Sequence, residues 1–218
     1  MVAAGARLTA DARTELLARI RSATRGAPPV TIPTEFRSRG ALDPALRVAR
    51  FCERVGDYRA EVRRVTDVAE AVTEAARRRA ATRFVVPAAL PHAWRPPELE
   101  LVDDVGFSPT ELDRMDGVIT GCTVAIAETG TIVLSGGAHE GRRAITLVPD
   151  LHICIVDEAQ IVELVPEAFA TLAELGLQAR PITFVSGPSA TSDIELSRVE
   201  GVHGPRELVV LVRTDLDG

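Results

Sequence analysis

The sequence contains neither lysine nor asparagine. Because lysine is missing, arginine supplies all 25 of the Lys and Arg positions. Without lysine the chain cannot form a lysine Schiff base, and it cannot build a Walker-type phosphate loop, which needs its lysine. We attribute this bias to a GC-rich genome rather than to function. Aromatic residues make up only 4% of the chain, so its core must consist mainly of Val, Leu, Ile and Ala.

Long apolar runs are also missing, and none approaches the length that a membrane-spanning helix needs. The stretch "MVAAGARLTADARTELLARI" lacks the sustained apolar segment of a signal peptide. We therefore expect a cytoplasmic protein. The net charge of −6 argues against a nucleic-acid partner, because such proteins carry a basic surface.

Cysteine is scarce, with Cys52, Cys122 and Cys154 widely spaced in apolar surroundings. No CxxC motif is present, so this chain alone can build neither a zinc ribbon nor an iron–sulfur cluster. We expect buried, reduced thiols, because free cysteine packs as a small apolar residue. The four histidines show no i, i+4 spacing, and we expect no metal site.

The first quarter of the chain has the pattern of two helices separated by a proline-containing break. Residues 8–23 place leucine and isoleucine at helical spacing, and residues 43–56 have Asp43 as a cap with Pro44 in the first turn. The break between them, "RGAPPVTIPTEF", should be extended. We therefore predict a helical N-terminal extension over residues 1–56.

From residue 57 onward, short apolar strands alternate with amphipathic helices. We expect helices over residues 66–80, capped by Thr66, and over residues 108–116, where Ser108 is the cap and Glu111 is at the third position. A further helix is expected over residues 159–176, where Pro166 should kink or divide it. The strands are expected at 58–65, 83–88, 99–104, 152–157, 182–187 and 208–213, with two further runs around a glycine turn in 117–137. This order predicts one α/β domain over 57–218, with a largely parallel sheet covered by helices on both faces.

Three stretches could carry chemistry, and the first is "AIAETGTIVLSGG". Glu128 and Thr129 follow an apolar strand, and Gly130 permits a tight turn. Ligands of open α/β sheets bind beyond the carboxyl ends of strands, where Glu128 would serve as a base, a nucleophile or a hydroxyl clamp. The alternative is an ordinary polar hairpin tip.

The second stretch is "GGAHEGRRAITLVPD", where three glycines form a loop followed by Arg142 and Arg143. The planar guanidinium group suits carboxylates and phosphates, so Arg143 is a candidate anion contact. The alternative is a solvated arginine pair.

The third stretch, "FVSGPSATSDIEL", begins at Phe184. Ser192 and Glu195 have the spacing of a capping box, which leaves Ser186, Ser189 and Thr191 unexplained. A glycine turn before a helix start directs N–H groups outward and suits an anion.

Two further groups near this stretch add candidate acid–base chemistry. Asp193 would oppose a pure phosphate site, so we expect donors for an anion and Asp193 for a substrate hydroxyl. In "GVHGP", His203 is either a general acid or base or a plain turn residue.

Together, "AIAETGTIVL", "SGPSATSDIE" and "GVHGP" closely resemble the LutC/YkgG family of lactate-utilisation proteins, the LUD domain, from about Gly117 to Val212. The resemblance implies a fold like that of the NagB, RpiA and CoA-transferase group. It also implies a role in bacterial oxidation of L-lactate to pyruvate, beside two partners, LutA-like and LutB-like, that hold the iron–sulfur clusters. This chain itself would hold no cofactor. Glu128 with Gly130 is similar in arrangement to the glutamate of CoA-transferases, although the surrounding residues differ.

The leading hypothesis is a cluster-free subunit of a lactate-oxidising system that binds a small anionic ligand or its partner proteins. The rivals are a stand-alone enzyme using Glu128 on a CoA ester, sugar phosphate or folate-like substrate, and a structural scaffold. The sequence leaves open whether the chain itself catalyses a reaction. The candidate catalytic residues are Glu128, Asp193 and His203. The candidate ligand-binding residues are Thr129, Gly130, Thr131, Arg143, Ser186, Gly187, Ser189, Thr191 and Gly204.

Overall fold

The computed structural model describes residues 10–28, 30, 31, 33, 35–191, 199, 200 and 204–214. The chain divides into two compact units, Met1–Phe36 and Arg37–Gly218. The first unit contains helix α1 (Ala10–Ala23), which the leucine and isoleucine spacing predicted. Beyond it, Thr24 donates its hydroxyl hydrogen to the carbonyl of Ile20, 3.0 Å away.

A six-stranded sheet forms the centre of the second unit, and every pair of neighbouring strands in it is parallel. Its strands, in spatial order, are β1 (Glu61–Val65), β12 (Glu207–Arg213), β7 (Leu151–Asp157), β4 (Gly117–Thr120), β2 (Arg83–Val86) and β3 (Glu100–Asp103). The central strands are mostly apolar and buried along most of their length because the sheet is covered on both faces. The predicted α/β class with a largely parallel sheet is confirmed.

Helix α3 (Val68–Arg77) covers one face of this sheet. Its buried side is made of Val and Ala, and it packs on large residues of the strands, among them Phe84, Ile119, Ile153 and Leu211. Small residues on the helix let its axis approach the sheet closely.

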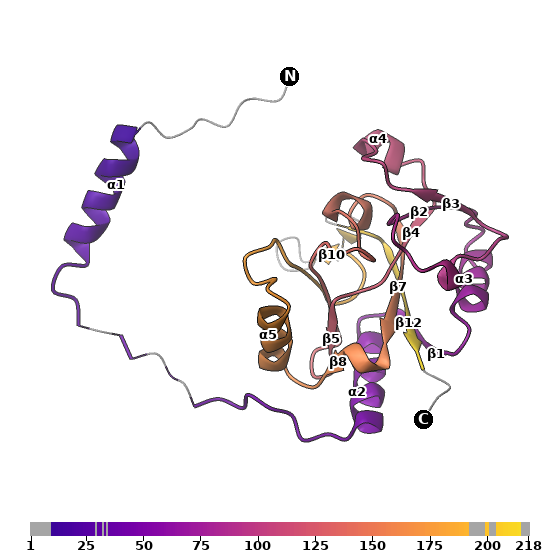
Figure 1. Ribbon diagram of the computed structural model, residues 1–218, viewed down its shortest axis with the longest axis horizontal. Helices are drawn as coiled ribbons and strands as arrows, with labels where there is room; N and C mark the ends of the chain where they lie inside the picture. The colour runs from indigo at the N-terminus through magenta and orange to yellow at the C-terminus, as the bar shows by residue number, and fades with distance from the viewer. Residues whose placement is uncertain are drawn as a thin grey trace. The chain divides into compact units, whose positions relative to one another are not determined.

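The other face is covered by helix α2 (Pro44–Asp57) and by a second sheet (Figure 1). The second sheet has the strand order β8 (Ile161–Val162), β5 (Val124–Ile126), β6 (Thr131–Leu134) and β9 (Thr183–Val185). Phe51 of α2 is fully buried in this layer. Helix α5 (Val165–Glu174) closes the far side of the second sheet through Ala168 and Leu172.

The remaining elements are short. They are α4 (Pro109–Leu112), η1 (His92–Trp94), η2 (Arg143–Thr146), η3 (Glu158–Gln160) and the antiparallel pair β10 (Ala190–Thr191) and β11 (Val199–Glu200). Ser108 and Glu111 form the expected capping box of α4. Helix α2 has its predicted cap, because the carboxylate of Asp43 accepts from the N–H of Leu46 at 2.9 Å.

Two local predictions were wrong. Asp67, rather than Thr66, caps α3, because the chain uses one more residue to leave β1, and the Asp67 carboxylate accepts from the Glu70 N–H at 2.9 Å. Pro166 does not kink a long helix but lies in the first turn of α5, where its missing N–H costs nothing. The β-branched residues Ile161 and Val162 before it pair with β5 instead.

Two strand predictions also need correction. Residues 117–137 form three strands rather than two, since β4 belongs to the parallel sheet while β5 and β6 make a hairpin in the second sheet. The strand expected at 182–187 is β9, which pairs antiparallel with β6. Apolarity alone could not separate the two sheets, because both are buried.

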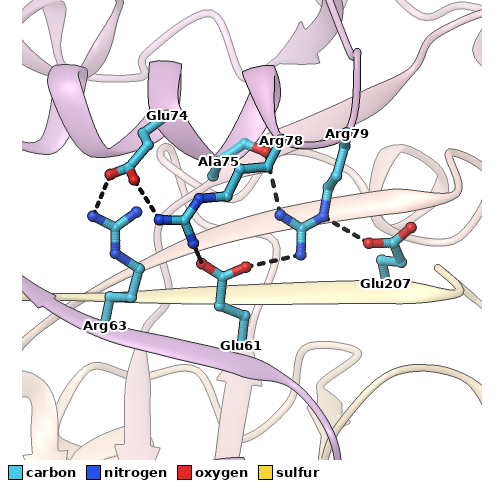
Figure 2. A network of polar contacts seen from close by, with 7 residues as sticks. All are labelled: Glu61, Arg63, Glu74, Ala75, Arg78, Arg79 and Glu207. Carbon is cyan, nitrogen blue, oxygen red and sulfur yellow. Dashed lines mark hydrogen bonds and ion pairs between the residues drawn. The ribbon is translucent and has the colours of Figure 1, made fainter.

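Ion pairs tie the end of α3 to strands β1 and β12. Figure 2 shows this network, which is made by Glu61, Arg63, Glu74, Arg78, Arg79 and Glu207. Arg79 joins the two strands, 2.6 Å from Glu207 of β12 and 2.9 Å from Glu61 of β1. The hydrogen bonds from Arg63 and Arg78 lower the pKa of the Glu74 carboxyl. The network aligns the helix with the amino ends of the two strands, although each exposed pair contributes little by itself.

Helix α2 belongs to the compact unit Arg37–Gly218, since its apolar side is part of the core between the two sheets. The domain boundary that we placed after residue 56 stays a prediction. Among the helices that the structure describes, none is both long enough and apolar enough to cross a membrane.

Candidate functional site

Gly130 forms the turn between β5 and β6, with φ at +61°. A Cβ atom at this position would lie 2.7 Å from the main-chain carbonyl carbon of Arg54 in α2. Glycine is therefore required here both for the backbone conformation and for the close approach of the helix. The hairpin tip and α2 are fixed against each other, and this fixes the positions of Glu128 and Thr129.

Glu128 points to the side of this tip where Arg37 lies, and its carboxylate is 2.6 Å from the Arg37 guanidinium. Both side chains are largely exposed, at 50% for Glu128 and 62% for Arg37. They border a cavity of about 310 Å³, together with Leu42, Arg50, Arg54 and Glu163. Glu128 follows a strand of the second sheet, so it does not lie at the carboxyl edge of the parallel sheet as we had reasoned.

A chain of three hydroxyl groups runs from the tip to the third motif. The Oγ1 atoms of Thr129 and Thr131 are 2.7 Å apart, and Oγ1 of Thr131 is 2.8 Å from Oγ of Ser186. Thr131 and Ser186 are 55 positions apart in the sequence, and the pairing of β6 with β9 brings them together. The structure thus joins the first and third motifs.

Ser186 opens onto a second cavity of about 240 Å³, which we call the hydroxyl cavity. The predicted residues Gly187, Ser189 and Gly204 also line it. The N–H of Ser189 donates to the carbonyl of Pro205 at 2.8 Å, which holds the two loops together. The hydroxyl cavity lies beside Leu208 and His152, near the amino ends of β12 and β7.

His152 also lines the hydroxyl cavity, although no motif in the sequence indicated it. It is 1% exposed, and its Nε2 lies 2.8 Å from Oγ1 of Thr120. The same hydroxyl is 3.9 Å from Sγ of Cys154, which is buried beside it. The available signal was a histidine inside an otherwise apolar strand, since a buried polar side chain needs a partner.

All three cysteines have free thiols, with Cys122 and Cys154 buried and Cys52 half-buried. The thiol of Cys122 donates to Oε1 of Gln160 at 3.5 Å. Interaction with the neighbouring Cys122 thiol, together with His152, lowers the pKa of Cys154. The same interaction raises the pKa of Cys122, together with burial. His152 therefore lies between the hydroxyl cavity and the two thiols of the core.

The second motif borders a third cavity, of about 630 Å³, which we call the arginine cavity. Gly136, Gly137 and Gly141 form its loop, and Arg143 lies on its wall. The carboxylate of Glu140, which is 3% exposed, accepts from the N–H groups of Ser135 at 2.6 Å and Gly137 at 2.9 Å. Glu140 thus holds the loop in shape from inside.

Arg142 and Arg143 have different roles. Arg142 makes a two-pronged contact with Asp104, at 2.6 and 2.9 Å, and also donates to the carbonyl of Phe107. The guanidinium of Arg142 lowers the pKa of the Asp104 carboxyl. The guanidinium group of Arg143 has no ion-pair or hydrogen-bond partner among the residues that the structure describes. The two arginines are therefore not a solvated pair.

The remaining candidates are placed in part or not at all. Asp193 and His203, with the capping pair Ser192 and Glu195, lie outside the described residues. Thr191 is at the end of β10, where its main chain pairs with Val199. Glu128 and Ser186 line different cavities, although the hydroxyl chain links their loops. No group of three His, Cys, Asp or Glu residues in the described part of the chain is placed to hold a metal ion.

Two sheets that share one core, one of them wholly parallel, together with the helices that cover them, define an α/β protein. Residues 109–212 match the sequence model of the LUD domain. Lactate utilization protein C of Deinococcus radiodurans is 44% identical over 207 residues, which cover 94% of this chain and 96% of that protein. The chain therefore belongs to the LUD-domain family, as the three motifs indicated.

Two further comparisons agree with this assignment. Lactate utilization protein C of Geobacillus kaustophilus is 38% identical over 96 residues, which cover 42% of this chain and 40% of that protein. The crystal structure of a DUF162 family protein from Deinococcus radiodurans superimposes with a TM-score of 0.70 at 40% sequence identity. The match covers 80% of this chain and 100% of the chain in that crystal structure.

Proposed function

We propose that this chain is the cluster-free subunit of a bacterial system that oxidises L-lactate to pyruvate, and that it binds a small anionic ligand in the hydroxyl cavity. The observation that supports this role is the similarity to Lactate utilization protein C of Deinococcus radiodurans over nearly the full length of both chains. A similarity of this extent includes the loops of the cavities and not only the core.

The lining of the hydroxyl cavity fits a small polar ligand. Ser186 and Ser189 bring hydroxyl groups to it, and each hydroxyl can both donate and accept a hydrogen bond. Gly187 has φ at +90°, and a Cβ there would lie 2.5 Å from the Tyr58 side chain. Only glycine therefore lets the loop pass this close to Tyr58. A loop held this closely is already shaped for its ligand, which lowers the entropy cost of binding.

We further propose that iron–sulfur proteins of the LutA-like and LutB-like kinds act beside this chain and carry the electrons. The support is chemical, since the three cysteines are far apart in sequence and include no CxxC pair. An oxidation of lactate releases two electrons for each molecule, and this subunit would supply binding and positioning rather than the redox centre.

Genetic complementation tests the proposal. A bacterial strain that lacks its own lactate utilization protein C is supplied with this chain, and growth on L-lactate is compared with growth on glucose. We expect rescue on L-lactate by the native sequence, loss of rescue with Ser186→Ala combined with Ser189→Ala, and full rescue with the exposed control Ser38→Ala. Lack of rescue by the native sequence, at normal protein levels, would contradict the role.

A stand-alone enzyme that uses Glu128 is the second candidate. It is favoured by the cavity beside Glu128, which three arginines border and which could hold an anionic substrate. Purified protein incubated with acetyl-CoA and examined by intact mass spectrometry tests this candidate, with Glu128→Gln as the matched control. A covalent adduct present in the native chain and missing from Glu128→Gln would favour the enzyme over the binding subunit.

A further inference from the structure

The arginine cavity has a cationic lining in a protein whose net charge is −6. Three guanidinium groups border it, those of Arg142, Arg143 and Arg180, against the carboxylates of Asp104 and Glu140. The two carboxylates are already engaged, Asp104 with Arg142 and Glu140 with main-chain N–H groups of its loop. Three guanidinium groups and two carboxylates leave the lining with one net positive charge, and the two guanidinium groups that are not paired with an acid are those of Arg143 and Arg180.

Neither of these two arginines has a carboxylate partner among the described residues. Arg180 donates only to the carbonyl of Gly136, at 3.0 Å, which places its guanidinium against the glycine loop. Other arginines of this unit do pair with acids, as Arg95 does with Asp103 and Arg206 with Asp150. Arg143 and Arg180 are thus two cations without an ion-pair partner on the wall of one cavity, an arrangement that suits an oxyanion.

The arginine cavity adjoins the hydroxyl cavity. Thr146 and Thr183 line both of them, so the two spaces meet at these side chains. Strand β9 starts at Thr183 and leads directly to Ser186, which gives the combined space a cationic end and a hydroxyl end. Among the described lining residues, the arginines and carboxylates lie at the cationic end, while the serine hydroxyls and His152 lie at the hydroxyl end.

We propose that the two cavities form one elongated site, in which Arg143 and Arg180 bind the oxyanion group of a ligand whose hydroxyl-bearing end lies between Ser186 and Ser189. The oxyanion is a phosphate ester or a carboxylate, since a guanidinium binds both in the same way. This inference rests on the proposed ligand-binding role and specifies the orientation and the chemical class of the ligand.

Calorimetric titration of the full chain tests the site with four probes, inorganic phosphate, glycerol, glycerol 3-phosphate and L-lactate. Glycerol 3-phosphate and L-lactate represent the two sources of the oxyanion, and each also carries a hydroxyl group. We expect at least one of them to bind roughly tenfold more tightly than inorganic phosphate or glycerol, because its two ends contact both cavities.

The variants separate the two ends of the site. Arg143→Gln combined with Arg180→Gln should weaken inorganic phosphate and the extended probe alike, by roughly tenfold, a change of about 1.4 kcal/mol. Ser186→Ala combined with Ser189→Ala should weaken the extended probe only. Arg77→Gln, at the exposed end of α3 on the opposite face of the sheet, is the matched control and should change neither affinity. Circular dichroism and the urea midpoint verify that each variant is folded.

The inference is overturned if no probe binds in the millimolar range, or if binding is unchanged in the arginine double variant. Equal weakening by Arg77→Gln would also overturn it, since the effect would then be one of net charge. These results are separate from the growth test, because rescue on L-lactate together with arginine-independent binding would leave the proposed function intact and reject only the elongated site.

Discussion

The carboxylate of Glu128 lies 2.6 Å from the guanidinium of Arg37, although 91 positions separate the two residues. Arg37 also lies 3.9 Å from the buried carboxylate of Glu163. The segment around Arg37 is held in place by other contacts, since the N–H of Leu42 donates to Glu163 at 2.7 Å and the N–H of Gly40 donates to Glu167 at 3.0 Å. Arg37 therefore forms an ion pair with the Glu128 carboxylate, which a nucleophilic mechanism would need unpaired.

The Arg37–Glu128 pair should contribute little to stability, because the side chain of Arg37 is 62% exposed and that of Glu128 is 50% exposed. We expect Arg37→Gln and Glu128→Gln each to change the free energy of unfolding by less than about 1 kcal/mol, with a coupling energy of similar size at most. Urea denaturation of the two single variants and the double variant measures this. A coupling energy well above that range would show that the pair is a structural clamp.

Glu140 should be a major contributor to stability, because its carboxylate is buried and accepts from two main-chain N–H groups. We expect Glu140→Gln to lower the free energy of unfolding by about 2–3 kcal/mol, since charge-assisted hydrogen bonds are lost and an amide N–H₂ group faces main-chain donors. Urea denaturation checks this, with the exposed Glu98→Gln as the control. Equal midpoints for the two variants would contradict this account of the loop.

Gly130→Ala should be more destabilising than Gly176→Ala. Both glycines have a similar positive φ, +61° and +67°, so both variants carry a backbone cost of about 1–2 kcal/mol. Only at Gly130 would the new Cβ meet main-chain atoms of α2, at 2.7 and 2.8 Å, whereas nothing lies within 4 Å at Gly176. We expect an additional loss of at least about 1 kcal/mol for Gly130→Ala, from overpacking. Thermal unfolding of both variants provides the comparison, and equal losses would refute the contact argument.

The stability contribution of Asp116 should depend on pH. Its carboxylate accepts from the N–H groups of Thr82 at 2.7 Å and Arg83 at 2.9 Å, and these bonds lower its pKa. A lowered pKa in the folded state means that the contribution is complete above the unfolded-state pKa, about 3.9, and is lost as the pH falls through the lower folded-state pKa.

We therefore expect Asp116→Asn to cost about 1 kcal/mol of unfolding free energy at pH 7 and progressively less below about pH 4. Urea denaturation at a series of pH values measures the difference between native and variant chains. Asp113→Asn, at an exposed position without a hydrogen bond of this kind, serves as the control and should show little pH dependence. A constant difference across the series would contradict the role of the ionised carboxylate.

Local patterns in the sequence predicted much of the fold. The cap of α2 at Asp43 and the capping box of α4 were predicted because both depend on residues within three positions of each other. The assignments failed where longer contacts decide. Whether residues 161 and 162 form the start of a helix or a strand depends on the pairing with β5, 36 positions away, which no local pattern contains.

The same division applies to the candidate site. The sequence by itself determined which chemical groups are available: arginine as the only strong cation, hydroxyl-rich loops, and no cysteine motif for a cluster. The tertiary structure alone decided their grouping, because strand pairing places Ser186 beside Thr131 and Arg180 beside Gly136, while it directs Glu128 toward Arg37. The chemical nature of a side chain is local, but its neighbours are set by the packing of distant strands. For that reason the sequence identified the LUD-domain motifs, and only the fold separated the acidic tip from the hydroxyl cavity.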